Sequence, residues 1–156
     1  FAVGSLSLYR TCVKKILPGA GSLKRIEAAL KAAIDKKDLL PGGKRSPLIC
    51  TGGTARAALK LARKYYGLPE SCRGISAGQL KRLCAVLSRG DRQAADLILK
   101  TEADRIHTLV PGMLILRHIA ARLDAEELVV SKYGVREGYL CQKLLTSDTI
   151  TPRTES

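Results

Sequence analysis

The chain has 156 residues, and its 27 Lys and Arg residues against 14 Asp and Glu residues give a formal net charge of +13 at pH 7. Apolar residues make up 46% of the sequence, which is enough for the core of one domain and excludes a disordered basic tail. No apolar run reaches about 18 residues, so the sequence offers no candidate for a membrane-spanning helix.

The positive charge is unevenly distributed along the sequence. Residues 1–100 contain 20 basic and 6 acidic residues, whereas residues 101–156 contain 7 basic and 8 acidic residues. Such a basic region favours a polyanionic partner, although a lysine-rich solvated surface explains the same numbers. Because aromatic residues make up only 4% of the chain, a protein that stacks the bases of single-stranded nucleic acid is disfavoured.

The cysteines and histidines indicate neither a disulfide framework nor a metal site. The five cysteines form no C-x-x-C pair, which favours a reducing compartment such as the cytoplasm. We expect Cys50 and Cys84 to be small core residues. His107 and His118 are eleven residues apart on one predicted helix, roughly 16 Å along its axis, and are too distant to share a metal.

The predicted elements follow one another in a helix-rich order. Hydrophobic periodicity, Gly and Pro predict an extended entry at 3–6, helices over 8–17, 23–34, 54–66, 80–89, 91–99, 105–123 and 135–145, and short strands over 48–50 and 128–130. Ser22 and Asp91 are the predicted N-caps of the second and fifth helices. Pro111-Gly112 predicts a kink or a fresh helix start. The fold class is therefore a helix-rich α/β fold.

The number of strands also bears on domain organisation. Two or three short strands do not make an independent parallel sheet, because such sheets need several neighbouring strands and cover on both faces. The chain begins with Phe1 rather than Met. We therefore expect it to be a piece of a longer protein that supplies the remaining strands.

A candidate anion site follows the first strand. Thr51-Gly52-Gly53-Thr54 joins that strand to a helix, and glycines there allow backbone N–H groups and the helix dipole to approach an oxyanion. Thr51 and Thr54 can add hydroxyl donors, and Arg56 can add a guanidinium. The sequence is neither a Walker A loop nor a G-x-G-x-x-G fingerprint. A purely structural Gly-Gly turn remains the alternative.

A second motif, Tyr133 to Tyr139, follows the second strand. Gly134 permits a left-handed turn, and Arg136 with Glu137 opens the last predicted helix. These two charges can face a ligand groove, or they can form a structural ion pair at the helix start.

Four segments together resemble a known family. They are residues 5–8, 50–56, 103–116 and 129–138, in that order. This series resembles the exopolyphosphatase / guanosine pentaphosphate phosphohydrolase (Ppx/GppA) family over residues 1–145, and Tyr-Gly-Val-Arg-Glu-Gly at 133–138 is the most specific part. One departure is Ile106-His107, where the family tends to have Ala-Asp after the arginine.

The resemblance implies an actin-like ATPase fold with two ribonuclease H-like domains and a phosphate-binding cleft between them. Family members remove a terminal phosphate by attack of water, with Mg²⁺ and a glutamate base. Residues 1–145 would then be an incomplete second domain, and residues 146–156 a loose polar tail. The family's catalytic and metal-binding residues fall outside this chain, so none is assigned here. Thr51, Gly52, Gly53, Thr54 and Arg56 are the expected phosphate-binding residues, and Arg105, Arg136 and Glu137 are cleft or structural candidates.

The leading hypothesis is that the chain is the C-terminal part of a cytoplasmic exopolyphosphatase-type hydrolase and is inactive alone. Its expected partners are polyphosphate or guanosine pentaphosphate and the missing N-terminal half, with a homodimer through an exposed sheet edge as a further expectation. A nucleic acid is a disfavoured partner. The alternatives are a basic helical module that binds nucleic acid or protein, and half of an actin-like-fold kinase.

Overall fold

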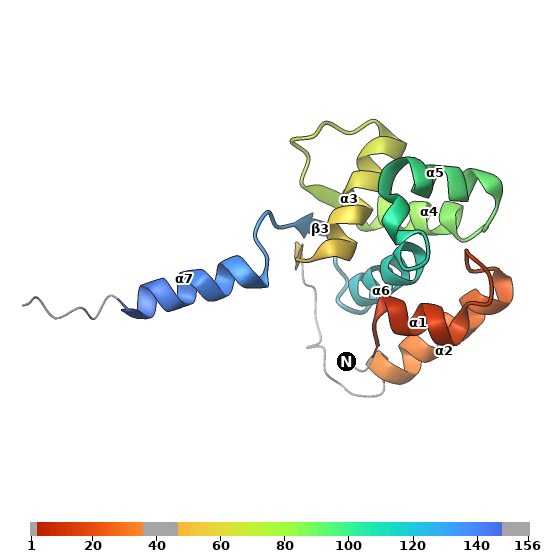
Figure 1. Ribbon diagram of the computed structural model, residues 1–156, viewed down its shortest axis with the longest axis horizontal. Coiled ribbons are helices and arrows are strands. Elements are labelled where there is room, and N and C mark those ends of the chain that lie inside the picture. The colour runs from red at the N-terminus through yellow and green to blue at the C-terminus, as the bar shows by residue number, and fades with distance from the viewer. Residues whose placement is uncertain (1–2, 36–46, 148–156) are drawn as a thin grey trace, which may run out of the picture.

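A computed structural model describes residues 3–35 and 47–147, drawn as coloured ribbon in Figure 1. The helices are α1 (Ser5–Cys12), α2 (Ala20–Ile34), α3 (Gly53–Tyr66), α4 (Ala77–Leu87), α5 (Arg92–Glu102), α6 (Leu109–Arg122) and α7 (Val135–Ser147), with a short 3₁₀ helix, η2 (Ala103–Arg105), before α6. The strands are β1 (Leu48–Cys50), β2 (Gly74–Ser76) and β3 (Glu127–Val130). This composition confirms the predicted helix-rich α/β fold.

The three strands form one small mixed sheet with the order β1-β3-β2. β1 pairs with β3 in parallel, with Cys50 opposite Val130, and β2 pairs with β3 in the antiparallel sense. Because β1 and β3 are adjacent and parallel, their carboxyl ends lie at the same edge of the sheet. Among the described strands β1 has a neighbour on one side only, and its Ile49 is 60% exposed.

The core lies around α6, which packs against α1, α3 and α4 (Figure 1). The predicted stripe of Leu80, Leu83, Cys84 and Leu87 on α4 is buried, and Met113 of α6 belongs to the same core cluster. Burial raises the pKa of the Cys84 thiol to about 12. The expectation that Cys84 is a core residue is confirmed, as it is for Cys50 at the end of β1.

Local signals located some helix boundaries correctly. The Asp91 carboxylate accepts a hydrogen bond from the N–H of Ala94 at 2.8 Å, which confirms the predicted N-cap of α5. The expected fresh helix start is also confirmed, because α6 begins at Leu109 and places Pro111 in its first turn. Proline is tolerated there since the first N–H groups of a helix have no partner within it.

Other predicted boundaries were wrong. The first helix covers Ser5–Cys12 rather than 8–17, so the expected extended entry at 3–6 is partly helical. Ser22 is not an N-cap, because α2 already begins at Ala20; the buried Ser22 hydroxyl instead accepts a hydrogen bond from Arg25 Nη2 at 3.2 Å. The predicted helix over 105–123 is η2, a turn and α6 in succession. The strand β2 was not predicted.

The two histidines join helices to one another. His118 Nε2 lies 2.9 Å from Asp35 Oδ1, which ties α6 to the residue that follows α2. The ring of His107 lies against the ring of Tyr9 with 4.9 Å between centroids, and so links the turn before α6 to α1. Both histidines therefore make contacts between helices in the structure.

The last helix, α7, extends away from the other helices in Figure 1. Its Tyr139, Leu140 and Leu145 are exposed, unlike the leucines of α4. α7 reaches Ser147, and the rest of the expected tail, residues 148–156, lies outside the described residues. None of the described helices is both long enough and apolar enough to cross a membrane.

Candidate functional site

The two motifs singled out in the sequence meet around one hollow of about 470 Å³. We call it the sheet-edge hollow, and its lining residues are Thr51, Gly52, Arg56, Gly134, Val135, Arg136 and Glu137. The motifs are about 80 residues apart in sequence, but each follows one of the two parallel strands. The N–H of Ser131 donates to the carbonyl of Cys50 at 2.9 Å and holds the two strand ends together.

The turn after β1 leaves the N-terminus of α3 open to the hollow. Gly52 is the N-cap of α3 and has φ of 94°, a region that strongly favours glycine. No side chain caps this helix end, and its first turn holds no acidic residue. The first N–H groups of α3 have no partners within the helix, and together with the helix dipole they favour a bound anion. Arg56 adds a positive charge one turn further along.

Arg105 reaches the same helix end from another direction. A Cβ built on Gly53 would lie 2.9 Å from the guanidinium carbon of Arg105, so the side chain rests directly on this glycine. Arg105 Nε also lies 3.7 Å from Glu102 Oε2, and the other oxygen of Glu102 lies 2.9 Å from Lys60 Nζ. A cation beside the positive end of a helix is electrostatically unfavourable on its own, and a bound anion would relieve this.

Thr54 lies on the side of α3 that faces the core rather than the sheet-edge hollow. Its Cγ2 would be 2.6 Å from a Cβ built on Gly112, and the Cβ of Ser5 would be 3.3 Å from the same position. The first turns of α1, α3 and α6 therefore meet here, and none of them contains an acidic residue. The structure thus places Thr54 where it joins these helix starts.

Glu137 serves the start of α7 and also lines the hollow. Its Oε2 accepts a hydrogen bond from the N–H of Gly134 at 2.7 Å, the usual position for a glutamate that closes a helix N-terminus. Hydrogen bonds from its own N–H and from that of Gly134, together with the charge of Arg56, lower the pKa of this carboxyl. At neutral pH Glu137 is ionised, and it partly offsets the positive charge of Arg56.

A second hollow of about 280 Å³ shares Arg56 with the first. We call it the arginine hollow, and its lining residues are Arg56, Leu59, Lys60, Arg63, Arg73, Val130, Ser131 and Lys132. Neither Arg73 nor Lys132 was predicted as a site residue from the sequence. Lys132 could have been predicted from its position, because it follows the second predicted strand just as the Thr51 turn follows the first.

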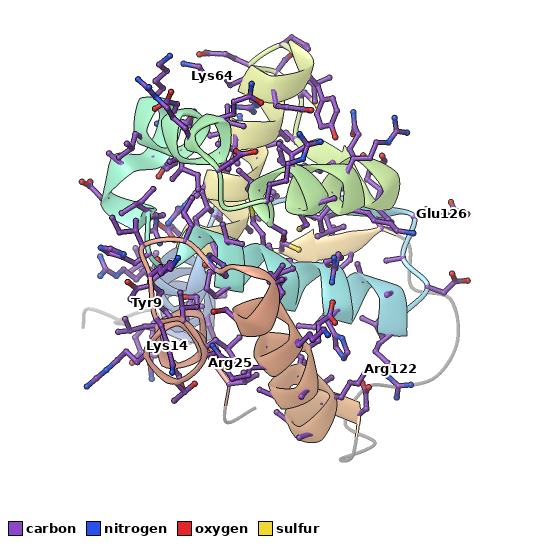
Figure 2. All side chains as sticks on the ribbon, turned by 90° about the vertical axis from the view of Figure 1, so that its right-hand side faces the viewer. Tyr9, Lys14, Arg25, Lys64, Arg122 and Glu126 are labelled. Carbon is purple, nitrogen blue, oxygen red and sulfur yellow. The ribbon has the colours of Figure 1, made fainter. Side chains whose placement is uncertain are left out.

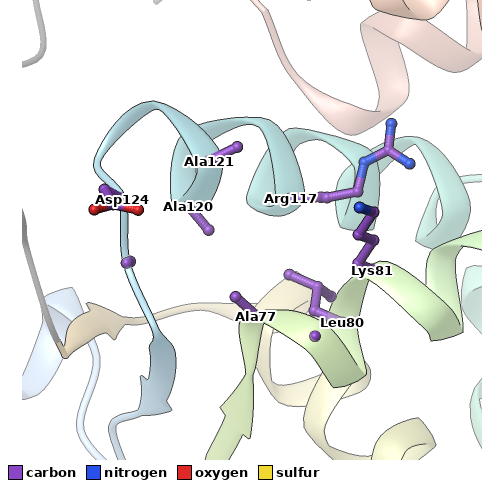
Figure 3. A pocket seen from close by; sticks show the side chains of 9 residues that line it. Ala77, Leu80, Lys81, Arg117, Ala120, Ala121 and Asp124 are labelled. Atoms are coloured by element: carbon purple, nitrogen blue, oxygen red, sulfur yellow. The ribbon is translucent and has the colours of Figure 1, made fainter.

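A third hollow, of about 250 Å³, lies between α4 and α6 (Figure 3). Ala77 and Ala120 face it, with Lys81 and Arg117 at one end and Asp124 at the other. It contains neither of the predicted motifs. Basic side chains also point outward elsewhere, as Lys14, Lys64 and Arg122 do in Figure 2, so positive charge alone does not locate a site.

A sequence model of the Ppx/GppA phosphatase family matches residues 1–147. The chain is similar to the crystal structure of the Aquifex aeolicus member of the Ppx/GppA protein family, with a TM-score of 0.72 and 21% identity over 94% of this chain and 48% of that one.

A second similar structure is the type II variant of the Aquifex aeolicus Ppx/GppA phosphatase, with a TM-score of 0.70 and 20% identity over 92% of this chain. The chain covers 48% of that protein as well, and so spans about half the length of both structures. These likenesses confirm the predicted fold, the actin-like ATPase type. No curated protein sequence matches the chain.

Proposed function

The chain belongs to the Ppx/GppA phosphatase family, and we propose that it forms one wall of the substrate cleft in an enzyme that hydrolyses the terminal phosphoanhydride bond of polyphosphate or guanosine pentaphosphate. The observation that carries this proposal is the sheet-edge hollow, where both sequence motifs meet around Arg56 and the open N-terminus of α3. Membership in a phosphatase family supplies the class of reaction, and the hollow supplies a place for phosphate oxygens.

In this proposal the residues of the chain bind and orient phosphate. Backbone N–H groups at the start of α3 donate hydrogen bonds to the phosphate oxygens, and Arg56 donates charge-assisted ones. Arg105, on the other side of Gly53, adds positive charge at the same helix end. Fixed donors of this kind stabilise the charge that develops as the phosphoanhydride bond breaks.

The metal and the general base are proposed to come from outside this chain. In the part of the chain that the structure describes, no group of three or more His, Cys, Asp or Glu side chains could hold a metal ion. These residues therefore do not fit a Mg²⁺ site by themselves, and no step of the proposal on this chain depends on one. The one carboxylate of the sheet-edge hollow, Glu137, is engaged by the start of α7.

The proposed partner is the remaining half of a longer family protein. The chain spans 48% of the similar solved structures, and it exposes Leu140 and Leu145 on α7 and Ile49 on β1. A second domain that covers these apolar side chains would place its own phosphate-binding groups opposite the sheet-edge hollow. A homodimer through β1 is the other arrangement that would cover Ile49. We also propose a cytoplasmic location, where the five free cysteines would stay reduced.

Binding measurements on the 156-residue chain test the proposal. In isothermal titration calorimetry with long-chain polyphosphate, Arg56→Gln should weaken binding about tenfold or more, because hydrogen bonds to charged groups contribute about 1.5–3 kcal/mol. The matched control is Arg89→Gln, which removes the same charge from an exposed position at the end of α4 outside both hollows. An equal loss of affinity in both variants would contradict a site at Arg56.

Competition and turnover separate this function from the alternatives. Long polyphosphate should displace a bound RNA oligomer far better than mononucleotides of equal total charge; the reverse order would favour a nucleic-acid-binding module. A longer protein containing this chain should release phosphate from polyphosphate without an acceptor, which a kinase would not do. The 156-residue chain alone should release none, and metal-dependent release by it would refute the division of roles proposed here.

A further inference from the structure

Glu102 is the last residue of α5, and its carboxylate contacts two cations at once. Its Oε1 lies 2.9 Å from Lys60 Nζ on α3, and its Oε2 lies 3.7 Å from Arg105 Nε in η2. α5 packs against α3, as Figure 1 shows. The Glu102 side chain is 21% exposed, whereas those of Lys60 and Arg105 are 61% and 40% exposed. The carboxylate is therefore the most shielded of the three charges, and it joins α3, α5 and η2.

Arg105 lies where a guanidinium is not favoured without such a partner. A Cβ built on Gly53, the first residue of α3, would be 2.9 Å from the guanidinium carbon of Arg105. The N-terminus of a helix carries a partial positive charge, which repels a cation. A long side chain that is held in one place also loses the rotamer freedom that it has in solvent. An attractive contact must offset both costs, and the carboxylate of Glu102 provides one.

Glu102 is the acidic partner that the structure gives to this arginine. Among the residues that the structure describes, no other carboxylate lies within 4.0 Å of the Arg105 guanidinium. The backbone at Arg105 is fixed separately, because η2 ends there and the N–H of Thr108 donates to the carbonyl of Arg105 at 3.0 Å. Glu102 therefore acts on the direction of the Arg105 side chain rather than on the position of its backbone.

We propose that Glu102 is a positioning residue, which holds the Arg105 guanidinium against the N-terminus of α3 so that it can pair with an anion bound there. This inference rests on the proposed function and adds a residue that does not touch the ligand itself. A carboxylate that acted on the anion only through its charge would repel it and weaken binding. Removal of the charge therefore has opposite effects in the two cases: positioning predicts weaker binding, and simple repulsion predicts tighter binding.

The variant Glu102→Gln tests this inference, because it removes the charge and keeps the length of the side chain. In isothermal titration calorimetry, the 156-residue chain with this change should bind tripolyphosphate about three- to fivefold more weakly, the order expected when a half-exposed ion pair is lost. The matched control is Glu27→Gln, which removes the partner of Arg117 at 3.1 Å between α2 and α6. The control should change the affinity by less than about twofold. Thermal unfolding confirms that each variant is folded.

A double-mutant cycle shows whether Glu102 acts through Arg105. Arg105→Gln alone should weaken the binding of tripolyphosphate about tenfold. Addition of Glu102→Gln to this variant should cause no further loss, because no guanidinium remains to be held. A purely structural role of Glu102 would instead lower the affinity in both backgrounds. NMR of the arginine Nε–H groups supplies a second readout: the Nε–H of Arg105 should be rigid in the unmodified chain and mobile on the ps–ns timescale in Glu102→Gln.

Unchanged or tighter binding by Glu102→Gln would overturn the inference. So would a further loss in the Arg105→Gln background, or an Arg105 Nε–H that stays as rigid in Glu102→Gln as in the unmodified chain. If tripolyphosphate binds and depends on Arg56 and Arg105 but not on Glu102, the positioning role is wrong and the proposed function stands. If the unmodified chain binds neither tripolyphosphate nor long-chain polyphosphate, the proposed function is wrong and the positioning role falls with it.

Discussion

The hollow between α4 and α6 and the sheet-edge hollow are built in opposite ways. The first lies between two packed helices where Ala77 and Ala120 face each other, and small side chains are enough to explain it (Figure 3). The second lies between two turns that follow parallel strands, and it is lined by Arg56 and by the start of α3, which no side chain caps. We therefore expect the helical body, which is the packed set of helices α1 to α6, to determine stability, and the sheet edge to determine binding.

The largest expected effect lies in the helical body. Leu83 on α4 is fully buried in the hydrophobic core. Leu83→Ala should lower the free energy of unfolding by about 2–5 kcal/mol, because it removes buried apolar surface and leaves a cavity. Urea unfolding followed by circular dichroism measures this loss. The protein that remains folded should bind polyphosphate within about twofold of the unmodified chain.

The control for this prediction is Leu99→Ala on α5, where the leucine is 52% exposed. It should cost about 0.5 kcal/mol or less. A loss of polyphosphate affinity in folded Leu83→Ala protein but not in Leu99→Ala protein would contradict the assignment of binding to the sheet edge alone.

A smaller effect is expected where the two regions meet, at Gly112. A Cβ at this position would lie 2.6 Å from Thr54 Cγ2, at the joint start of α1, α3 and α6. Gly112→Ala should therefore cost about 1–3 kcal/mol of unfolding free energy through overpacking. Because Thr54 must move with the start of α3, polyphosphate affinity should fall as well, which would show that the helical body and the sheet edge are coupled at Gly112.

Gly138→Ala on α7 is the matched control, since a Cβ there has nothing within 4 Å. Alanine is the better helix former, so this variant should be as stable as the unmodified chain or slightly more so. Thr54→Ser removes the closest methyl group and should recover part of the stability lost in Gly112→Ala. The prediction fails if Gly112→Ala and Gly138→Ala unfold at the same urea concentration.

Short-range patterns were sufficient to predict most of the helical body. The apolar stripe on α4 repeats at three- and four-residue intervals, and the N-cap residue Asp91 lies directly before α5. Both patterns are therefore local to the helix that they predict. The first helix was misplaced because Leu17, although buried, belongs to a non-helical segment that follows α1. Burial alone does not distinguish a residue inside a helix from a buried residue in the irregular segment that follows it.

Features that depend on distant contacts were harder to predict. Three residues, Gly74–Ser76, carry no strand pattern of their own, and β2 exists because it pairs with β3 more than 50 residues later. The sheet-edge hollow was predicted in part. Both motifs were identified from the sequence, but that they lie side by side depends on the parallel pairing of β1 and β3, which the sequence did not predict. Arg73 was missed because its position at the carboxyl end of β3 depends on β2.

The smallest effect is expected at the sheet edge itself, from Glu137. Hydrogen bonds from its own N–H and from that of Gly134, and the charge of Arg56, lower the pKa of this carboxyl below its ordinary value of 4.5. The ionised form is therefore favoured in the folded state. Its contribution to the start of α7 is complete above about pH 4.5 and is lost as the pH falls through the lowered pKa. The amide proton of Gly134, followed by NMR, should titrate with that lowered midpoint.

Removing the charge of Glu137 tests whether the carboxylate acts only on α7 or also on the proposed anion site. In Glu137→Gln the Gly134 amide should no longer titrate, while Glu70→Gln, an exposed control in the loop after α3, should leave that titration unchanged. Tripolyphosphate should bind Glu137→Gln about two- to fivefold more tightly, because Arg56 is then no longer partly offset by a neighbouring negative charge. Unchanged affinity together with a lost titration would mean that Glu137 belongs to the helix start alone. The sheet edge would then, like the helical body, contain residues whose role is purely structural.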